Sequence, residues 1–202
     1  IQLAPGDSPR AMMGYSITQL LYILNHYSLI SDGFKNELNK TASLIDELQE
    51  EIQADAEKMT NHLFGKIPII YACDGYKGMA VRFTQQLAEN SKMLSWHNII
   101  PEMNHNELVG WRTKNENLAV IFFRNETDHK RNQKRIEINN EVVSKYTSSV
   151  MEYWSKGDSM IEKTFYLINV CDHVSFNLSK RNNVIVEEIE VINYLKGELA
   201  KF

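Results

Sequence analysis

The densest group of polar side chains in the sequence spans residues 101–107, directly after a short apolar run. Its sequence is Pro-Glu-Met-Asn-His-Asn-Glu. A histidine exchanges a proton near neutral pH, and the flanking Asn104 and Asn106 are ready partners to fix the tautomer of His105. The pattern indicates a candidate acid–base site. The alternative is a helix start at which Asn and Glu only cap the backbone.

Three other charged residues could take part in chemistry. Glu89 lies at the end of a predicted helix, where its charge opposes the helix dipole, so a functional carboxylate or simple exposure must explain it. Arg10 adjoins an apolar helix, and Lys196 lies near the end of the last helix. For both of these cations the alternative is an ordinary position on the surface.

Other kinds of site have little support in the sequence. Cys73 and Cys171 are far apart and predict two reduced, largely buried thiols. No two histidines have the spacing, with a carboxylate, that a zinc site on a helix needs. Neither a Gly-x-Gly-x-x-Gly fingerprint nor a Walker-type phosphate loop is present, which counts against a nucleotide-binding domain. We therefore expect neither a metal nor another cofactor.

Composition limits the partners of the chain. Its 202 residues are 43% hydrophobic and 24% charged, which is ordinary for one globular domain, alone or with an appendage. The net charge of −4 argues against a general nucleic-acid binder. No apolar run reaches the roughly 18 residues that cross a bilayer. We expect no nucleic-acid or membrane partner and a cytoplasmic location.

The hydrophobic pattern predicts a series of alternating strands and helices. Strands are predicted over 67–73, 96–101, 118–123 and 149–154, and helices over 12–29, 34–63, 79–92, 128–145, 158–180 and 187–202, with Thr127 or Asp128 capping the helix at 128. This order predicts an α/β fold, a parallel sheet flanked by helices. Ligands of such sheets bind beyond the carboxyl ends of the strands, so we expect residues 74–78, 101–111 and 124–129 near any site.

Four segments together make the chain resemble the C-terminal half of bifunctional phosphoglucose/phosphomannose isomerases, which have the sugar-isomerase (SIS) fold. Ser-Pro-Arg-Ala-Met-Met-Gly-Tyr-Ser at 8–16 is similar to the family's Pro-Arg-Ala-x-x-Gly-Tyr. Gln-Leu-Ala-Glu-Asn-Ser-Lys at 86–92 is similar to its Gln-Leu-Asn-Glu-Asn-Ala-Lys. The most specific match is 101–111, which includes Asn-His-Asn-Glu, and 191–196 is similar to the family's closing Val-Ile-x-x-Leu-Lys.

The resemblance implies a three-layer, flavodoxin-like SIS domain with long leading helices. Residues 1–65 would form the leading helices and an inter-domain connection, and residues 66–202 the C-terminal SIS domain. The chain begins with Ile1 and an immediate turn at 5–9. We therefore expect an N-terminal SIS domain to be lacking from it, and the segment alone to turn over substrate poorly.

The implied activity is aldose–ketose isomerisation of glucose 6-phosphate, mannose 6-phosphate or both to fructose 6-phosphate, through an enediol. Glu89 would move the proton between C1 and C2, and Arg10 would stabilise the enediolate. His105 would open the sugar ring in the neighbouring subunit of a homodimer, assisted by Lys196. Arg10, Asn104 and Lys196 would bind substrate. These residue types suit a base, a permanent cation and a neutral-pH acid.

Two departures from the family pattern leave an alternative open. Residues 184–188 replace the family's Asp-Pro-Thr-Pro, and no Ser/Thr-rich phosphate loop is recognisable. The alternative is a non-catalytic SIS module that binds a sugar phosphate or mediates dimerisation. The joint occurrence of Arg10, Glu89, His105 and Lys196 favours the enzyme, because a binding module has no need for both the glutamate and the lysine.

Overall fold

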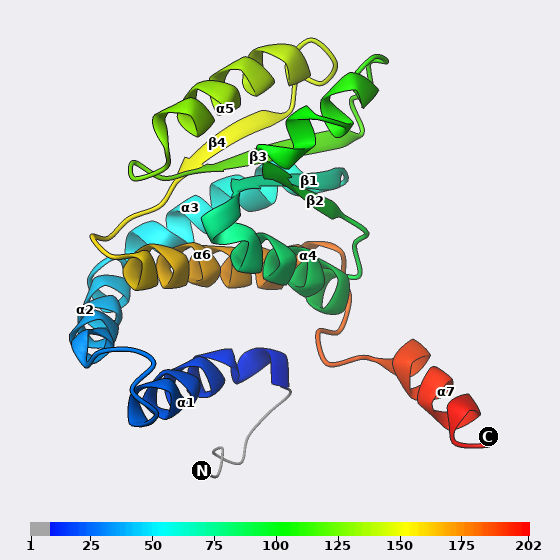
Figure 1. Ribbon diagram of the computed structural model, residues 1–202. Helices are drawn as coiled ribbons and strands as arrows, with labels where there is room; N and C mark the ends of the chain where they lie inside the picture. The colour runs from blue at the N-terminus through cyan, green and yellow to red at the C-terminus, as the bar shows by residue number, and fades with distance from the viewer. Residues whose placement is uncertain (1–8) are drawn as a thin grey trace.

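A four-stranded parallel sheet forms the centre of the computed structural model, which describes residues 9–202 (Figure 1). The strands lie in the order β2-β1-β3-β4; they are β1 (Ile67–Cys73), β2 (Trp96–Ile100), β3 (Leu118–Arg124) and β4 (Val150–Trp154). In the central strands β1 and β3 every residue after the first is buried. This confirms that the two longest apolar runs are strands covered on both faces.

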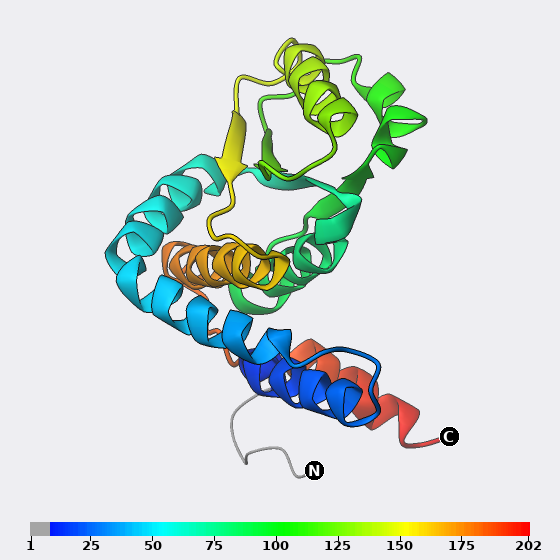
Figure 2. The same cartoon turned by 60° about the vertical axis from the view of Figure 1, so that its left-hand side comes forward.

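Helices cover both faces of the sheet. The helices are α1 (Met13–His26), α2 (Gly33–Glu47), α3 (Gln49–Leu63), α4 (Lys77–Ser91), α5 (Lys130–Val143), α6 (Met160–Arg181) and α7 (Glu190–Leu199). Helices α3, α4 and α6 lie on one face, over a core that includes Phe83, Phe123 and Tyr166 (Figures 1 and 2). Helix α5 covers Tyr71 and Phe122 on the other face. The predicted three-layer α/β architecture is thereby confirmed.

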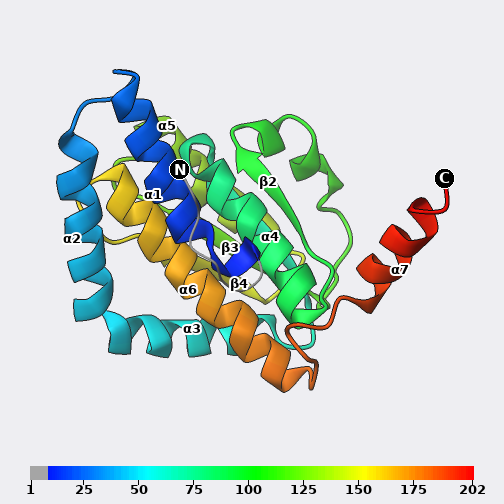
Figure 3. The same cartoon turned by 90° about the horizontal axis from the view of Figure 1, so that it is seen from below.

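The predicted single helix over 34–63 is wrong, since the chain bends at Leu48 (φ −98°, ψ 12°) between α2 and α3. Figure 3 shows the two helices at a steep angle. The bend lets Leu48 pack against the core while α3 buries Ile52 and Met59 in the layer beneath the sheet. Tertiary packing therefore interrupts a helix that the local sequence would continue. The domain division at residue 65 stays a prediction.

Smaller differences concern the ends of elements. Helix α5 begins at Lys130 and is capped by His129, whose Nδ1 accepts the N–H of Arg131 at 3.2 Å, so the predicted caps Thr127 and Asp128 are wrong. Short 3₁₀ turns occur at η1 (Pro9–Ala11), η2 (Asp74–Tyr76), η3 (Glu102–Asn104) and η4 (Glu107–Gly110). Of the turn predicted at 5–9, residues 5–8 lie outside the described residues.

The two thiols are buried and neither forms a disulfide. Burial raises the pKa of both, that of Cys73 to about 12. In the part of the chain that is described, no helix has both the length and the apolar character to span a bilayer.

The outermost helices are the least covered. Neither α1 nor α7 has a buried residue, and α7 projects away from the body of the molecule (Figures 1 and 3). The exposed side chains of α7 include Val191, Tyr194 and Leu199. Large apolar surfaces of this kind mark places where other protein binds.

Candidate active site

Arg10 and Glu89, which are distant in sequence, form an ion pair. Arg10 lies in η1 and Glu89 near the end of α4, and Nη1 of the arginine is 2.8 Å from Oε2 of the glutamate. The second guanidinium nitrogen, Nη2, donates to the backbone carbonyl of Val186 at 2.9 Å. The arginine side chain is 14% exposed and the glutamate 40%. A permanently charged donor therefore lies beside a carboxylate that solvent can reach.

A second arginine holds the segment that carries Arg10. Arg82, on α4, donates through Nη2 to the carbonyl of Arg10 at 3.1 Å and to Oδ2 of Asp172, on α6, at 2.7 Å. Gln86 donates to the other oxygen of Asp172 at 3.0 Å. The sequence motifs assigned no role to these three residues. For Arg82 and Gln86 the available signal was their spacing with Glu89, which places all three on one helix face.

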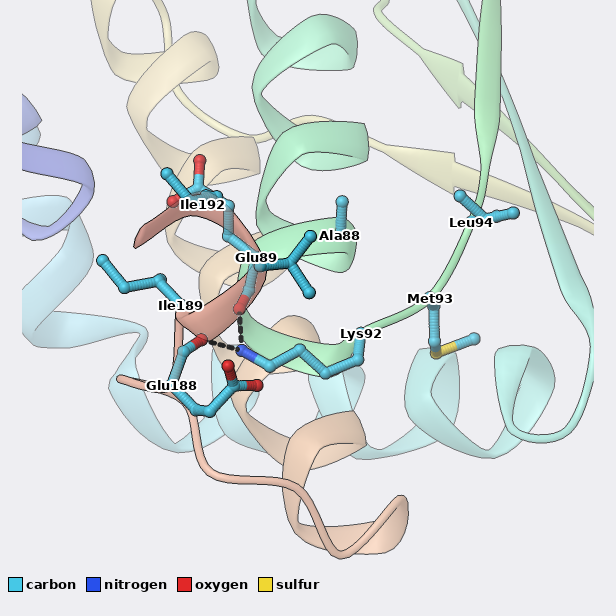
Figure 4. A pocket seen from close by; sticks show the side chains of 9 residues that line it. Ala88, Glu89, Lys92, Met93, Leu94, Glu188, Ile189 and Ile192 are labelled. Atoms are coloured by element: carbon cyan, nitrogen blue, oxygen red, sulfur yellow. Dashed lines mark hydrogen bonds between the residues drawn. The ribbon is translucent and has the colours of Figure 1, made fainter. Parts of the chain in front are cut away.

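Lys92 fixes the segment that follows α6. The residue is in the left-handed conformation (φ 57°) at the end of α4. Its Nζ donates to the carbonyls of Glu89 at 2.6 Å, Glu188 at 2.8 Å and Val186 at 3.3 Å, and Figure 4 shows the first two bonds. The region that departs from the family's Asp-Pro-Thr-Pro thus lies against the Arg10–Glu89 pair and contacts it through backbone atoms.

Two cavities adjoin this cluster. One, of about 430 Å³, is lined by polar side chains that include Arg10, Gln86, Asn90 and Asp172. The other, of about 450 Å³, is lined by Glu89 and Lys92 together with apolar residues; these are Ala88, Met93, Leu94, Ile189, Val191 and Ile192 (Figure 4). Both volumes lie in the range of small-molecule sites. A ligand in the first cavity would meet the guanidinium of Arg10, and a ligand in the second would meet the carboxylate of Glu89.

His105 lies at the other end of the sheet. It follows β2 at the carboxyl end of the strands, whereas α4 begins there at Lys77 and carries Glu89 about 18 Å back along its axis, toward the amino ends. The expectation that segments at the carboxyl ends surround the whole site is therefore wrong for Glu89 and Arg10. One chain brings these two residues together and leaves His105 apart from them.

The asparagines beside His105 do not fix its ring. Asn104 donates to Oδ1 of Asn139, on α5, at 2.6 Å, and Asn106 donates to Oε1 of Glu102 at 3.0 Å. The predicted tautomer-fixing role of both is wrong, because each amide bonds to another side chain and the exposed His105 ring takes part in neither bond. The amide oxygen of Asn104 is buried without a partner among the described residues.

Lys196 is exposed on the projecting helix α7. In the described residues it forms no ion pair with Glu89 or with another carboxylate. The four residues singled out by sequence thus divide into one assembled pair and two isolated groups. Within residues 9–202, no three His, Cys, Asp or Glu side chains are grouped to hold a metal ion.

The chain is similar to a known protein family and to longer curated proteins. The model of the family described as the bacterial phospho-glucose isomerase C-terminal SIS domain matches residues 52–199. The bifunctional phosphoglucose/phosphomannose isomerase of Caldicellulosiruptor bescii is 30% identical to this chain, and the match covers 100% of this chain and 62% of that protein. The enzyme of the same name from Aquifex aeolicus is 26% identical, over 99% of this chain and 61% of that protein. The chain thus spans less than two thirds of the length of these relatives.

The fold also matches solved structures. The crystal structure of glucosamine-6-phosphate deaminase from Thermotoga maritima superposes with a TM-score of 0.62, at 10% identity, over 93% of this chain and 56% of that one. At this identity the likeness concerns the fold alone. It agrees with the three layers described above.

Proposed function

Because the chain belongs to the family of bacterial phospho-glucose isomerase C-terminal SIS domains, we propose that it acts in hexose 6-phosphate isomerisation, as the C-terminal half of the enzyme. The reaction interconverts glucose 6-phosphate, mannose 6-phosphate or both with fructose 6-phosphate. The observation that carries the proposal is the Arg10–Glu89 pair between two cavities of sugar size. We propose that the protein acts in the cytoplasm, and that the reaction belongs to glycolysis or gluconeogenesis.

The two residues divide the work of the proton transfer. Isomerisation removes a proton from C2 of the open-chain aldose and returns it to C1, which one carboxylate within reach of both carbons can do. Negative charge develops on the substrate oxygens in the enediolate, and a guanidinium that does not lose its proton stabilises it. Arg10 is held on two sides, by Val186 and by Glu89, and is therefore oriented before substrate arrives.

Ring opening requires a group that Glu89 and Arg10 do not supply. We propose that His105 acts in the site of a neighbouring subunit, because it lies at the opposite end of the sheet from its own Glu89. A homodimer would bring the two ends together. Lys196 would assist from α7, whose uncovered apolar side chains suit a contact with another protein surface. A substrate contact of Asn104 stays a prediction, since its amide is turned toward α5.

Mixing two inactive variants tests both the activity and the shared site. In the native protein, Glu89→Gln and His105→Ala should each abolish most conversion of fructose 6-phosphate. After the two variants are unfolded and refolded together, half of the dimers are mixed, and each of these has one intact site of two. About a quarter of wild-type activity should therefore return.

Two results would contradict the proposal. An inactive wild-type protein that still binds hexose phosphate would favour the non-catalytic module. Mixed variants that stay inactive, although mass spectrometry shows mixed dimers, would place His105 in its own subunit or outside the reaction.

A further inference from the structure

Glu107, the last residue of the Asn-His-Asn-Glu motif, has no part in the proposed reaction, yet its carboxylate is the centre of a hydrogen-bond network. Oε1 accepts from Nε1 of Trp96 at 3.0 Å and from the hydroxyl of Tyr71, and Oε2 accepts from Nδ2 of Asn98 at 2.6 Å. No ion pair within residues 9–202 includes it. Three neutral donors therefore bind both oxygens, which leaves little capacity for chemistry on a substrate.

The network joins the two sides of the loop 101–111 to the sheet. Trp96 and Asn98 belong to β2, which enters the loop, and Tyr71 belongs to the neighbouring strand β1. Trp111, where the loop ends, donates through Nε1 to the hydroxyl of Tyr71 at 3.2 Å. Tyr71 is fully buried, and burial together with the Glu107 charge raises its pKa, so its hydroxyl keeps the proton that it donates.

The other side chains around His105 are also tied to the protein. Asn104 bonds to Asn139 on α5, and Asn106 both donates to Glu102 and accepts the N–H of Glu107 at 2.6 Å. His105 is exposed, and its ring takes part in none of these bonds. Figure 1 shows this green segment between β2 and β3 above the edge of the sheet, on the same side as α5. The loop therefore presents the exposed His105 side chain on a backbone braced by its neighbours.

We infer that Glu107 is a positioning residue, which braces the loop 101–111 so that His105 is held ready for ring opening in the site that it completes. The catalytic meaning of this inference rests on the proposed function; the bracing does not. Misplacement of a catalytic group by about 1 Å costs about 100-fold in rate, so a loosened loop should be visible in turnover.

Glu107→Gln tests the inference without removing volume. A glutamine has one acceptor oxygen in place of two, so its amide N–H groups face a donor among Tyr71, Trp96 and Asn98. In the native protein we expect kcat for cyclic hexose phosphate to fall by about 10- to 100-fold with KM within about twofold. Glu102→Gln, on the same loop, keeps an oxygen that can accept the bond from Asn106; it is the matched control and should stay within about twofold of wild type.

A double variant shows whether Glu107 acts through His105. If it does, Glu107→Gln combined with His105→Ala is no slower than His105→Ala alone. A substrate analogue that cannot cyclise should be turned over by Glu107→Gln at the wild-type rate, because ring opening is bypassed. A further loss in the double variant, or an equal loss with the open-chain analogue, would overturn the positioning role.

Hydrogen exchange separates the inference from the proposed function. Glu107→Gln should speed amide exchange in residues 101–111 by tenfold or more and leave α6 unchanged. Trp96→Phe, which removes a single donor at a half-exposed position, should act in the same direction and guards against a variant that does not fold. Unchanged exchange in the loop of both variants overturns the bracing, whatever the activity. Faster exchange in a protein whose wild type is no isomerase supports the bracing and refutes only the reaction.

Discussion

Replacement of Glu89 by glutamine separates the chemical role of this residue from its structural one. Glutamine keeps the size of the side chain, and its amide oxygen can still accept the 2.8 Å bond from Arg10. It cannot take a proton from carbon. General base catalysis contributes about 10²- to 10⁴-fold, which is about 3–5 kcal/mol of transition-state stabilisation. We therefore expect kcat to fall by two to four orders of magnitude.

The same substitution should leave the fold nearly intact. The glutamate side chain is 40% exposed, and ion pairs with a solvated partner contribute about 0–1 kcal/mol to stability. The free energy of unfolding from denaturant titration should therefore change by no more than about 1 kcal/mol. The contrast between a large kinetic loss and a small loss of stability identifies a residue that acts on substrate.

The assay follows both isomerisation and the proton. Conversion of fructose 6-phosphate in deuterated water measures turnover and the solvent exchange that a carboxylate base permits. The matched control is Glu57→Gln, which breaks an ion pair with Arg181 of similar exposure, at 51% for the glutamate. We expect the control to retain wild-type turnover. A Glu89→Gln enzyme with more than about a tenth of wild-type kcat would refute the base assignment.

Two further predictions follow from neighbouring groups. Arg82→Lys keeps the charge but cannot donate to both Asp172 and the carbonyl of Arg10 as the guanidinium does. We expect kcat/KM to fall about tenfold, while the free energy of unfolding changes by less than about 1 kcal/mol. An unchanged kcat/KM would show that the Arg10 segment needs no such support. Burial lowers the pKa of His62 below its ordinary 6.5, although the ring bonds to the carbonyl of Val120. The unfolded state therefore binds the proton more tightly, and stability should decline as pH falls below about 6.5, by up to about 1.4 kcal/mol per unit of pKa difference. Denaturant titration of His62→Gln between pH 7.5 and about pH 5 should show a weaker decline than wild type, and an identical decline would assign it to other groups.

The layers of the fold could be predicted because a strand that is buried on both faces needs a continuous run of apolar residues, which is visible in the sequence. The runs 67–73 and 118–123 contain almost no polar residue, and both form central strands. The bend at Leu48 has no such visible signal, since neither glycine nor proline occurs there. It arises because α2 and α3 both pack against α6, which lies more than a hundred residues beyond Leu48 in the chain.

Site residues could be predicted where they belong to a short sequence motif, but not where only the folded chain brings them together. Arg10 and Glu89 were identified through short matching segments, and the structure places them in contact. Asp172 lies in a long helix with no local pattern around it, so only the folded chain reveals that it anchors Arg82. The rule about carboxyl ends pointed to His105 and away from Glu89, because it describes ligands bound at the strand ends of one sheet, and Glu89 lies near the far end of α4.

The carbonyl of Val186 accepts hydrogen bonds from both Arg10 and Lys92. Every amino acid supplies this acceptor, proline included, so natural variation at position 186 is free to alter the side chain without erasing the contact. Selection there would act on the path of the main chain. A sequence that differs from Asp-Pro-Thr-Pro in this stretch can therefore still supply the backbone carbonyl that binds the guanidinium of Arg10. Amino-acid identity at position 186 is accordingly a poor measure of family membership.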